Sequence, residues 1–331
     1  MSPTLTSTLE LDWNSSDRRL GREMSQRIEQ LPTRPRGVSQ WALAWRRLKK
    51  NKTAIAGLAI VGAFVVMAAF DRLVALYPPK CIVGLSPACP SPDFISNGPP
   101  SLSHPFGTDI TGYDVYSEIV YGTRAAFLIG LGATGLAILI AVTIGLVAGY
   151  FGNWIDNLLM RVTEVFLVIP FFLLLLVFLQ VTLKFAPAST GGLWIVVFVI
   201  GAFSWPGAAR IIRGEILKVR EFEFIAASRQ IGASSSRILF RHLFPNVLHI
   251  IIVLLTLQIA TSILTEAAVS FLGFGAPGSN TWGQQMYTSA NFIAQAWWAT
   301  LFPALFVTIM VMGFNLLGNG LRDALDPRLR E

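Results

Sequence analysis

Six apolar runs constrain the fold of this chain more than any other feature. Each has about eighteen or more residues with few or no charges, enough for a helix to cross a hydrocarbon core of roughly 30 Å. In lipid every backbone N–H group must be satisfied inside the protein, which favours helices over strands. We therefore predict an all-α polytopic membrane protein. The expected spans are Thr53–Phe70, Ala125–Tyr150, Val165–Leu183, Leu193–Ala209, Val247–Leu272 and Trp298–Leu317.

The distribution of charge predicts the orientation of the spans. A net charge of +7 would fit nucleic-acid binding, but Lys and Arg gather in two regions. Residues 1–52 hold eleven Lys or Arg against five acids, and residues 210–241 hold seven against three. Cytoplasmic loops of membrane proteins collect these residues. Four predicted spans separate the two regions, so both regions and both termini are expected in the cytoplasm, and no nucleic-acid partner is expected.

The apolar runs divide the chain into segments. Residues 1–38 are polar, with prolines and scattered arginines, and are expected to be a flexible cytoplasmic tail. Roughly fifty polar residues precede the first span, which is not the pattern of a cleavable signal. We expect an external loop at 71–124, a transmembrane domain at 125–321 with a cytoplasmic segment at 210–246, and a second cytoplasmic tail at 322–331.

The segment before the first span has an amphipathic pattern. In residues 39–52, Trp41, Trp45 and Leu48 recur at helical spacing, while basic residues crowd the other side. This pattern favours a helix lying in the membrane interface with its cations on lipid phosphates. The alternative is that these residues are the frayed start of the first span, 53–70.

The external loop is long enough to carry a function of its own. It contains both cysteines of the chain, Cys81 and Cys89, separated by seven residues. In an oxidising compartment they would form a disulfide; the alternative is two free thiols without a role. A metal site is not expected, because His104 is the only other soft ligand in this loop.

Prolines and glycines predict irregularities in the spans. Pro170 is expected to kink the third span, because proline removes a backbone hydrogen bond and clashes with the preceding turn. Pro206 interrupts the fourth span. Gly145 and Gly149 of the second span are expected to allow close helix packing.

Aromatic residues and one acid stand near the outer ends of the last spans. Trp282, Tyr287, Trp297 and Trp298 predict an interfacial aromatic belt, with the lining of an entrance as the alternative. Glu266 follows nineteen residues without Asp, Glu, Lys or Arg, and such an acid faces the bundle interior or water. Glu266 is a candidate for a translocation pathway; the alternatives are an internal hydrogen-bonded strut and a neutral side chain without a role.

Several catalytic motifs are absent from the sequence. No G-x-x-x-x-G-K-[ST] occurs, and none of the lysines follows a glycine. The chain therefore lacks a phosphate-binding loop of its own. H-E-x-x-H and G-x-S-x-G are missing as well. We expect a protein that is not itself an enzyme and binds no cofactor.

The stretch EFEFIAASRQIGASSSRILFRHLFPN, Glu221–Asn246, interrupts the apolar sequence. It predicts a short helix ended by Gly232, since glycine readily adopts the left-handed conformation there. Ser234 or Ser235 would cap a second short helix, which Pro245 would separate from the next span.

The first of these short helices is expected to carry an interaction surface. Phe222, Ile225 and Ala226 would cluster on one side of it, with small residues at Ala226 and Ala227. An apolar surface turned toward the cytoplasm implies a protein partner. The alternative is an ordinary basic cytoplasmic loop.

Several stretches in a fixed order carry a family resemblance. They are WRRLKKN at 45–51, HPFGTD at 104–109, AASRQIG at 226–232, RHLFPN at 241–246, ILTEAAVSFLGFG at 263–275 and FNLLGNGLRDALDPRL at 314–329. With these stretches the chain resembles the C-type permease subunit of binding-protein-dependent ABC importers, in the dipeptide, oligopeptide and nickel group. The resemblance implies a type I ABC importer permease fold.

The resemblance also implies partners and roles. The stretch at 226–232 resembles the EAA loop, which forms the coupling helix that docks into an ATP-binding subunit. The residues implied in coupling are Glu221, Glu223, Ala226, Ala227, Gly232, Ala233, Arg241 and Pro245. The chain departs from the family at Ala226, where the family has a glutamate, and Glu221 or Glu223 are the acids that would substitute for it.

The outer loop resembles the surface that meets an external solute-binding protein. The residues implied there are His104, Gly107, Asp109 and Asp114. The remaining implied partners are a second permease subunit and two ATP-binding subunits, which carry ATP and Mg. The expected function is half of the channel of an importer for dipeptides, oligopeptides or related solutes. The alternatives are an ion-coupled secondary carrier, which would use Glu266, and a membrane scaffold or receptor.

Overall fold

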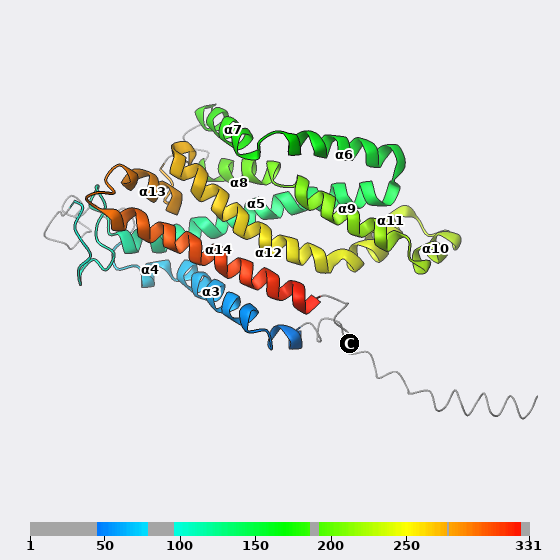
Figure 1. Cartoon of the computed structure of the whole chain (residues 1–331), viewed down its shortest axis with the longest axis horizontal. Helices are drawn as coiled ribbons and strands as arrows, with labels where there is room; N and C mark the ends of the chain where they lie inside the picture. The colour runs from blue at the N-terminus through cyan, green and yellow to red at the C-terminus, as the bar shows by residue number, and fades with distance from the viewer. Residues whose placement is uncertain (1–44, 79–95, 186–191, 277, 326–331) are drawn as a thin grey trace, which may run out of the picture. The chain divides into compact units, whose positions relative to one another are not determined.

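The computed structural model describes residues 45–78, 96–185, 192–276 and 278–325. The chain divides into two units, residues 1–46 and 47–331. Apart from one isolated bridge between Thr108 and Asp114, the regular elements of the described residues are helices (Figure 1). The predicted N-terminal tail, residues 39–44 of the predicted interfacial helix, and both Cys81 and Cys89 lie outside the described residues.

Among the described residues, four helical runs are long and apolar enough to cross a membrane. They are α3 (Lys52–Ala69), α5 (Val115–Phe151), the continuous run Ser235–Phe274 and α14 (Trp297–Leu325). Two bent helix pairs also qualify: α6 (Asn153–Val168) with α7 (Phe171–Phe185), and α8 (Gly192–Phe203) with α9 (Pro206–Arg220). If each pair crosses once, the described residues supply the six spans that the sequence predicts.

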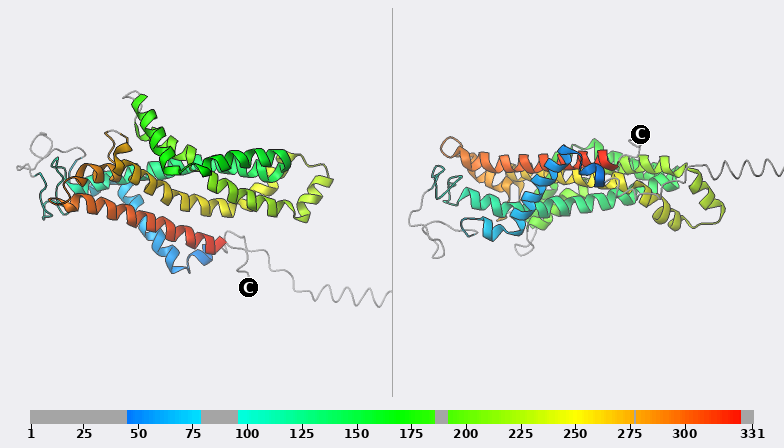
Figure 2. Two further views of the ribbon diagram at one scale, coloured as in Figure 1. Left: turned by 45° about the horizontal axis from the view of Figure 1, so that its top comes forward. Right: turned by 90° about the horizontal axis from the view of Figure 1, so that it is seen from below.

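The run Ser235–Phe274 is built from four pieces. They are α11 (Ser235–Arg237), the π-helical η2 (Ile238–Leu243), α12 (Phe244–Val269) and the π-helical η3 (Ser270–Phe274). The remaining short helices are α4 (Asp71–Val74), α10 (Glu223–Gln230) and α13 (Trp282–Ala290). Within the second unit, α10 and α11 lie at one end of the bundle and α13 at the other (Figures 1 and 2).

A polar cap separates α3 from the residues before it. The Asn51 side-chain oxygen accepts hydrogen bonds from the backbone N–H groups of Thr53 and Ala54, at 3.0 and 3.2 Å. Asn51 itself is extended, with φ −84° and ψ 108°, and a helical turn at 45–48 precedes it. This turn is therefore not a continuation of α3, whereas its position at the membrane interface stays a prediction.

Helix α5 begins ten residues earlier than the second predicted span. The Asp114 side chain accepts a hydrogen bond from the Ser117 N–H at 2.8 Å and so caps the helix at Val115. Residues 115–124, which were predicted as part of the external loop, therefore form the first turns of α5. At the other end of the fold, α14 extends to Leu325, so the predicted C-terminal tail begins inside a helix.

The glycines of α5 allow the close packing that the sequence predicts. A Cβ atom at Gly145 would lie 2.8 Å from the Ile212 side chain, and one at Gly149 would lie 2.6 Å from that of Ile216. Both isoleucines are fully buried residues of α9. These two glycines therefore let α5 and α9 approach more closely than any larger residue would permit.

The bend at Pro170 in the third predicted span is much larger than the predicted kink. Helices α6 and α7 meet at 85°, with Ile169 and Pro170 between them. Ile169 is extended, with ψ 130°, because the ring of the following proline disfavours a helical conformation there. The prediction of one span at Val165–Leu183 is therefore wrong in its extent: α6 starts at Asn153, and α7 is a separate helix of the pair.

Pro206 bends the fourth predicted span by 42°. Proline stands at the first position of α9, where its missing N–H group would have no partner in any case. Helix α9 then continues to Arg220, eleven residues beyond the predicted end at Ala209. The basic part of this region is thus helical and leads directly into the stretch that contains α10.

Three buried apolar clusters hold the helices together. One joins α3, α5, α12, α13 and α14, with Trp282 and Met310 among its members. A second joins α5 and α9 to the region of α10, η2 and α12, through Ile216, Ile225 and Ile238. The third packs α7 and α8 against α5. The two ends of the bundle therefore belong to different clusters.

Candidate functional site

The residues between α9 and α12, Glu221–Asn246, form what we call the coupling segment. Its first helix, α10, turns Ile225 and Ser228 toward the bundle, and both are buried. The Ser228 hydroxyl donates to the Phe224 carbonyl oxygen at 2.7 Å, which satisfies it in that position. The outward side of α10 carries Ala226 and Ala227, which are both exposed.

The predicted face of α10 is therefore wrong in one respect. Ile225 is buried, whereas Ala226 and Phe222, the extended residue before the helix, are exposed, so the three residues do not form one surface. Residues three apart share a face, and the buried pair is Ile225 with Ser228. Ala226 and Ala227 consequently form a small, outward surface, as their assignment to partner contact requires.

Gly232 ends α10 in the conformation that the sequence predicts. Its φ is +79°, in the left-handed region. The Gly232 N–H donates to the Arg229 carbonyl at 3.0 Å, and the Ala233 N–H donates to the Ser228 carbonyl at 3.1 Å. These two bonds form a Schellman motif, which satisfies the last carbonyl groups of the helix. A Cβ atom at Gly232 would meet no atom within 4 Å, so it is the backbone conformation and not lack of space that favours glycine there.

Pro245 does not separate the second short helix from the next span, contrary to prediction. Ser234 caps α11 by accepting from the Arg237 N–H at 3.4 Å, and the helix then runs without a break through Pro245. The preceding turn, η2, is π-helical, and Phe244 N–H donates to the Leu239 carbonyl five residues back. The wider turn accommodates the proline, which has no N–H group to contribute.

The coupling segment exposes several large apolar side chains. Ile231 is 84% exposed and Phe240 is 68% exposed. Phe222 and Phe224 are exposed as well, with ring centroids 5.9 Å apart. We refer to these four residues, together with Ala226 and Ala227, as the coupling surface. An apolar surface on a segment rich in charged residues is typical of a protein interface.

Arginine contacts join the coupling segment to the bundle. The Arg220 guanidinium donates to the Gly149 carbonyl at 2.9 Å, at the end of α5, and lies 3.3 Å from Glu221. The Arg229 guanidinium lies over the Tyr150 ring, 5.4 Å from its centroid. Arg229 thus attaches the C-terminal end of α10 to the end of α5, and Arg220, the last residue of α9, attaches the chain just before α10 to the same place. A displacement of α10 would therefore act on α5.

The other residues assigned to coupling are accessible in varying degree. Glu223 is exposed in the first turn of α10, where the helix dipole favours an acid. Ala233 is half-buried, whereas Arg241 and Pro245 are exposed. Glu221 pairs with Arg220 at 3.3 Å, and the substitution of Glu221 or Glu223 for the family's glutamate stays a prediction.

Glu266 is buried inside the bundle. Its side chain is 3% exposed and accepts a hydrogen bond from the Ser270 hydroxyl at 2.6 Å. It also hydrogen-bonds with the side chain of Thr281, whose oxygen caps α13 by accepting from the Gln284 N–H. Glu266 thus links α12 to η3 and to the start of α13. This geometry is that of an internal strut, while a role in a translocation pathway stays a prediction.

Residues 96–114, which we call the outer segment after their predicted location, are organised by a buried histidine–aspartate pair. His104 Nδ1 lies 3.0 Å from Asp114 Oδ1. The second carboxylate oxygen of Asp114 accepts from the Ser117 N–H and from its hydroxyl, at 2.8 and 2.7 Å. The Tyr77 ring stacks on the His104 ring, with centroids 4.9 Å apart. His104 and Asp114 are 5% and 3% exposed, so they stabilise this segment from its interior and do not form its surface.

The other two residues assigned to this surface also have internal roles. Gly107 has φ +74°, and a Cβ atom there would lie 2.5 Å from the Trp298 ring nitrogen. Asp109 accepts hydrogen bonds from Thr111 and Tyr113 N–H groups, at 2.9 and 2.8 Å. Burial raises the pKa of the Asp109 carboxyl, and these hydrogen bonds oppose the rise. Contact between the outer segment and an external protein stays a prediction, for which other residues of the segment are more exposed.

Two of the four aromatic residues predicted to form a belt are core residues instead. Trp282 and Trp298 are 1% and 7% exposed. The Trp282 ring nitrogen donates to the Ile119 carbonyl at 2.9 Å, and that of Trp298 donates to the Thr108 carbonyl at 3.1 Å. Burial is possible because each indole N–H group finds a backbone acceptor. Tyr287 and Trp297 are exposed, as a belt requires.

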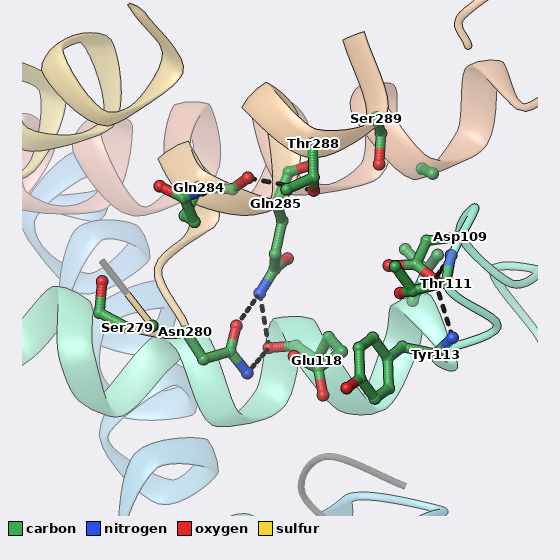
Figure 3. A pocket seen from close by; sticks show the side chains of 13 residues that line it. Asp109, Thr111, Tyr113, Glu118, Ser279, Asn280, Gln284, Gln285, Thr288 and Ser289 are labelled. Atoms are coloured by element: carbon green, nitrogen blue, oxygen red, sulfur yellow. Dashed lines mark hydrogen bonds between the residues drawn. The ribbon is translucent and has the colours of Figure 1, made fainter. Parts of the chain in front are cut away.

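A cavity of about 300 Å³ lies at the outer end. It is lined by residues of the outer segment, the first turn of α5, residues 278–280, α13 and Ala299 of α14 (Figure 3). Asp109 and Glu118 are among the lining residues, and Gln285 extends from α13 toward α5. No pattern in the sequence pointed to Gln285. Within the described ranges, no three His, Cys, Asp or Glu side chains gather as metal ligands would.

A bundle of apolar helices with an exposed coupling segment at one end defines a membrane permease component. The chain belongs to the family described as the binding-protein-dependent transport system inner membrane component, which matches residues 141–331. Residues 39–97 match the N-terminal TM domain of oligopeptide transport permease C. The resemblance found in the sequence is therefore confirmed, and with it the membrane location and the permease fold.

Relatives are similar over nearly the whole chain. The dipeptide transport system permease protein DppC of Alkalihalophilus pseudofirmus is 38% identical over 294 residues, which cover 88% of this chain and 91% of the relative. The oligopeptide transport system permease protein OppC of Bacillus subtilis is 34% identical, covering 89% and 92%. The glutathione transport system permease protein GsiD of Escherichia coli is 35% identical, covering 88% and 91%.

Proposed function

We propose that this chain forms one half of the transmembrane channel of an ATP-driven importer for dipeptides, oligopeptides or similar solutes. A second permease subunit would supply the other half, and an external solute-binding protein would deliver the solute. The names of the relatives support a peptide substrate. The observation that carries the proposal is the coupling surface, which lies on the stretch that resembles the coupling helix of the family.

In this function the energy comes from separate ATP-binding subunits, which hold ATP and Mg. The coupling surface offers small residues, Ala226 and Ala227, beside large apolar ones such as Phe240. The small residues would let a partner groove approach the backbone of α10, and the large ones would fill pockets beside it. Closure of the ATP-binding subunits would then move α10 as a rigid piece.

The movement would reach the spans through the contacts of the coupling segment. Ile225 and Ile238 bury their side chains in the cluster that also contains Ile216 of α9. Arg220 holds the end of α5. A displacement of α10 would therefore act on α5, α9 and α12 together, and rocking of these helices would switch access to the channel between the two sides.

The comparisons give no support to an ion-coupled carrier. That alternative needs ionisable groups in the spans that bind and release an ion. Glu266, its candidate, is hydrogen-bonded to Ser270 and Thr281 and buried in the contact of α12 with α13. The positive charge of residues 210–241 supports a cytoplasmic location of the coupling segment and of both termini.

The test is co-purification from native membranes in mild detergent, followed by mass spectrometry. The tagged chain should recover a second permease and one or two ATP-binding subunits. Ala227→Arg, which places a charge on the coupling surface, should lose the ATP-binding subunits and keep the second permease. Ala69→Arg is the matched control, because Ala69 is also exposed but ends α3. Recovery of the chain without ATP-binding subunits would contradict the proposal.

A further inference from the structure

A two-pronged ion pair joins α6 to α9. The Arg213 guanidinium donates through Nε to Asp156 Oδ1 and through Nη2 to Asp156 Oδ2, both at 2.5 Å. The two residues are 57 positions apart in the sequence, and their side chains are 30% and 13% exposed. An arginine that contacts both oxygens of one carboxylate fixes its orientation as well as its distance. By contrast, the ion pair of Arg161 with Glu164 lies within α6 and joins no second helix.

A second arginine of α9 holds the other side of the corner between α5 and α6. The Arg220 guanidinium donates to the Gly149 carbonyl at 2.9 Å, in the last turn of α5. The chain turns at Gly152, whose φ is +66°, and Asp156 follows in the first turn of α6. Arg213 and Arg220 are seven residues apart, roughly two helical turns, so they project from the same face of α9. The two arginines therefore attach α9 to the corner on both of its sides.

Few of the side chains of α6 are buried. Within α6, all of whose residues are described, Thr163 is the only buried residue, and Trp154 and Val165 are exposed. The Phe166 ring packs edge-on against the ring of Trp205, with centroids 5.4 Å apart. Trp205 immediately precedes α9, and the two helices run side by side (Figures 1 and 2). Helix α6 is thus attached to α9 by the ion pair near its start and by the aromatic contact near its end.

Helix α7 is held against other helices. Leu175 and Leu179 are fully buried in the cluster that packs α7 on α8 and α5. Between α6 and α7, Ile169 is extended and Pro170 has no N–H group, so the helical hydrogen bonding is interrupted there. Breaks at the ends of helices absorb the changes in φ and ψ when one element moves against another. A rotation of α6 about residues 169–170 therefore need not displace α7.

From this geometry we propose that Arg213 is a positioning residue of the transport cycle, which makes α6 follow α9 when the coupling segment moves. The proposal rests on the proposed function, because the movement of the coupling segment comes from the ATP-binding subunits. Helix α9 leads directly into the coupling segment at Glu221. A displacement there would pass along α9 to Arg213 and through Asp156 to the start of α6. Helix α6 would turn about Ile169 and Pro170, and α7 would stay against α8.

An ion pair suits this role better than the aromatic contact at Phe166. Apolar side chains can slide over one another and keep most of their contact area. A bidentate pair loses both of its hydrogen bonds on a small displacement, which leaves two partly buried charges without partners. The pair of Arg213 with Asp156 therefore resists a displacement of α6 relative to α9 in any direction. Removal of one partner should uncouple the two helices.

The test compares changes in hydrogen exchange on nucleotide binding. The importer complex in lipid nanodiscs is incubated with and without a non-hydrolysable ATP analogue and Mg, and exchange is followed in α10, in residues 153–160 of α6 and in α7. In the wild type the analogue should change exchange in α10 and in α6 and leave α7 unchanged. In Arg213→Gln the response of α10 should persist, and that of α6 should fall about tenfold, as expected for one lost charge-assisted contact.

Matched variants separate the ion pair from a general effect of charge. Asp156→Asn should behave as Arg213→Gln does, because it removes the other partner. Lys218→Gln removes another cation of α9, whose partner Glu215 lies on the same helix, so the response of α6 should persist. The exchange of the two partners, Asp156→Arg with Arg213→Asp, restores an ion pair between the helices and should restore the response of α6. Co-purification of the second permease shows that each variant is assembled.

A purely structural role is distinguished by the coupling of transport to ATP hydrolysis. Uptake of labelled trialanine and ATP hydrolysis are measured with the same variants in proteoliposomes. Arg213→Gln should lower the number of peptides taken up per ATP hydrolysed, and the exchanged pair should restore it. Loss of a contact that only stabilises the chain would lower uptake and hydrolysis together.

The proposal would be overturned if α10 of the wild type responded to the analogue and α6 did not. A full response of α6 in both Arg213→Gln and Asp156→Asn, or an unchanged number of peptides per ATP in both, would overturn it as well. In each of these cases α10 responds and the wild type transports, so the proposed function stands. A wild-type complex without uptake and without a response in α10 would instead contradict the proposed function, and this proposal with it.

Discussion

The two ends of the second unit are held together in different ways. At the outer end, polar groups from distant parts of the sequence meet: Trp298 donates to the Thr108 carbonyl, and Trp282 donates to that of Ile119. In the coupling segment, the hydrogen bonds of Ser228 and Ser234 remain within four residues. The long-range contacts of the coupling segment are mainly the apolar ones of its buried isoleucines.

This difference is informative about function. Directional hydrogen bonds between distant segments fix one arrangement, because a small displacement leaves buried polar groups without partners. Apolar contacts tolerate sliding, and the coupling surface remains exposed for a partner. The outer end is therefore built to keep its shape, and the coupling segment to move as one piece. Variants at the two ends should consequently fail in different ways.

The largest effect is expected from removal of the Trp282 side chain. Trp282→Ala would leave a cavity beside Phe64 and Phe306, whose rings lie 5.9 and 6.3 Å away, and would remove the hydrogen bond from the indole N–H to the Ile119 carbonyl. We expect a loss of about 3–5 kcal/mol in the free energy of unfolding. Thermal unfolding of the purified protein in one detergent measures it. Trp154→Ala, at a tryptophan that is 70% exposed, is the control and should change the midpoint little.

The buried pair of the outer segment should give the next largest effect. His104→Ala would leave Asp114 Oδ1 without its partner in a site that is 3% exposed. The cost is about 1–3 kcal/mol, confined to the outer segment. Hydrogen exchange in residues 98–118 should become faster, while exchange in α10 should not change. Faster exchange at both ends would show that the two ends are not independent, contrary to the contrast drawn above.

A third variant acts on the coupling segment through the backbone. Gly232→Val forces a β-branched residue into the left-handed region at a cost of about 1–2 kcal/mol, and the Schellman motif should open. The importer should lose most of its peptide uptake while the chain still reaches the membrane. Gly232→Asn is the control, since asparagine tolerates this conformation. Normal uptake with valine at this position would remove the coupling assignment.

The sequence predicted the local features of the fold, such as helix caps and helix ends, well. Gly232 was identified because glycine favours the left-handed conformation that ends a helix, and the cap of the second short helix was narrowed to Ser234 or Ser235, of which the structure uses Ser234. The start of α5 carried a similar signal, with Asp114 as the cap and Glu118 as an acid in the first turn. The prediction missed it, because it began the span only after the last charged residue. Hydropathy locates the part of a helix that lies in lipid, and α5 extends beyond it.

What the sequence could not predict depends on packing between distant residues. Pro170 indicated a bend, but the angle of 85° depends on what α6 and α7 pack against. Trp282 and Trp298 have the composition of an interfacial belt, and only the fold shows that backbone carbonyls 163 and 190 residues away accept from them. The orientation of Gln285 in the outer cavity is of the same kind, because it is set by a carbonyl of α5.

The smallest effect is expected where the coupling segment has its one aromatic–cation contact with α5. Arg229→Met keeps the aliphatic part of the side chain and removes the charge over the Tyr150 ring, a contact worth about 0.5–1 kcal/mol at an exposed site. The rate of amide hydrogen exchange in α10 should rise by no more than about fivefold, because the buried Ile225 still packs the helix against the bundle. Arg237→Met, at an exposed arginine of α11, should change nothing. Arg229→Met could instead speed exchange in α10 as much as His104→Ala speeds it in the outer segment. The coupling segment would then be held by a directional contact, as the outer segment is. It could move as one piece only if α5 moved with it.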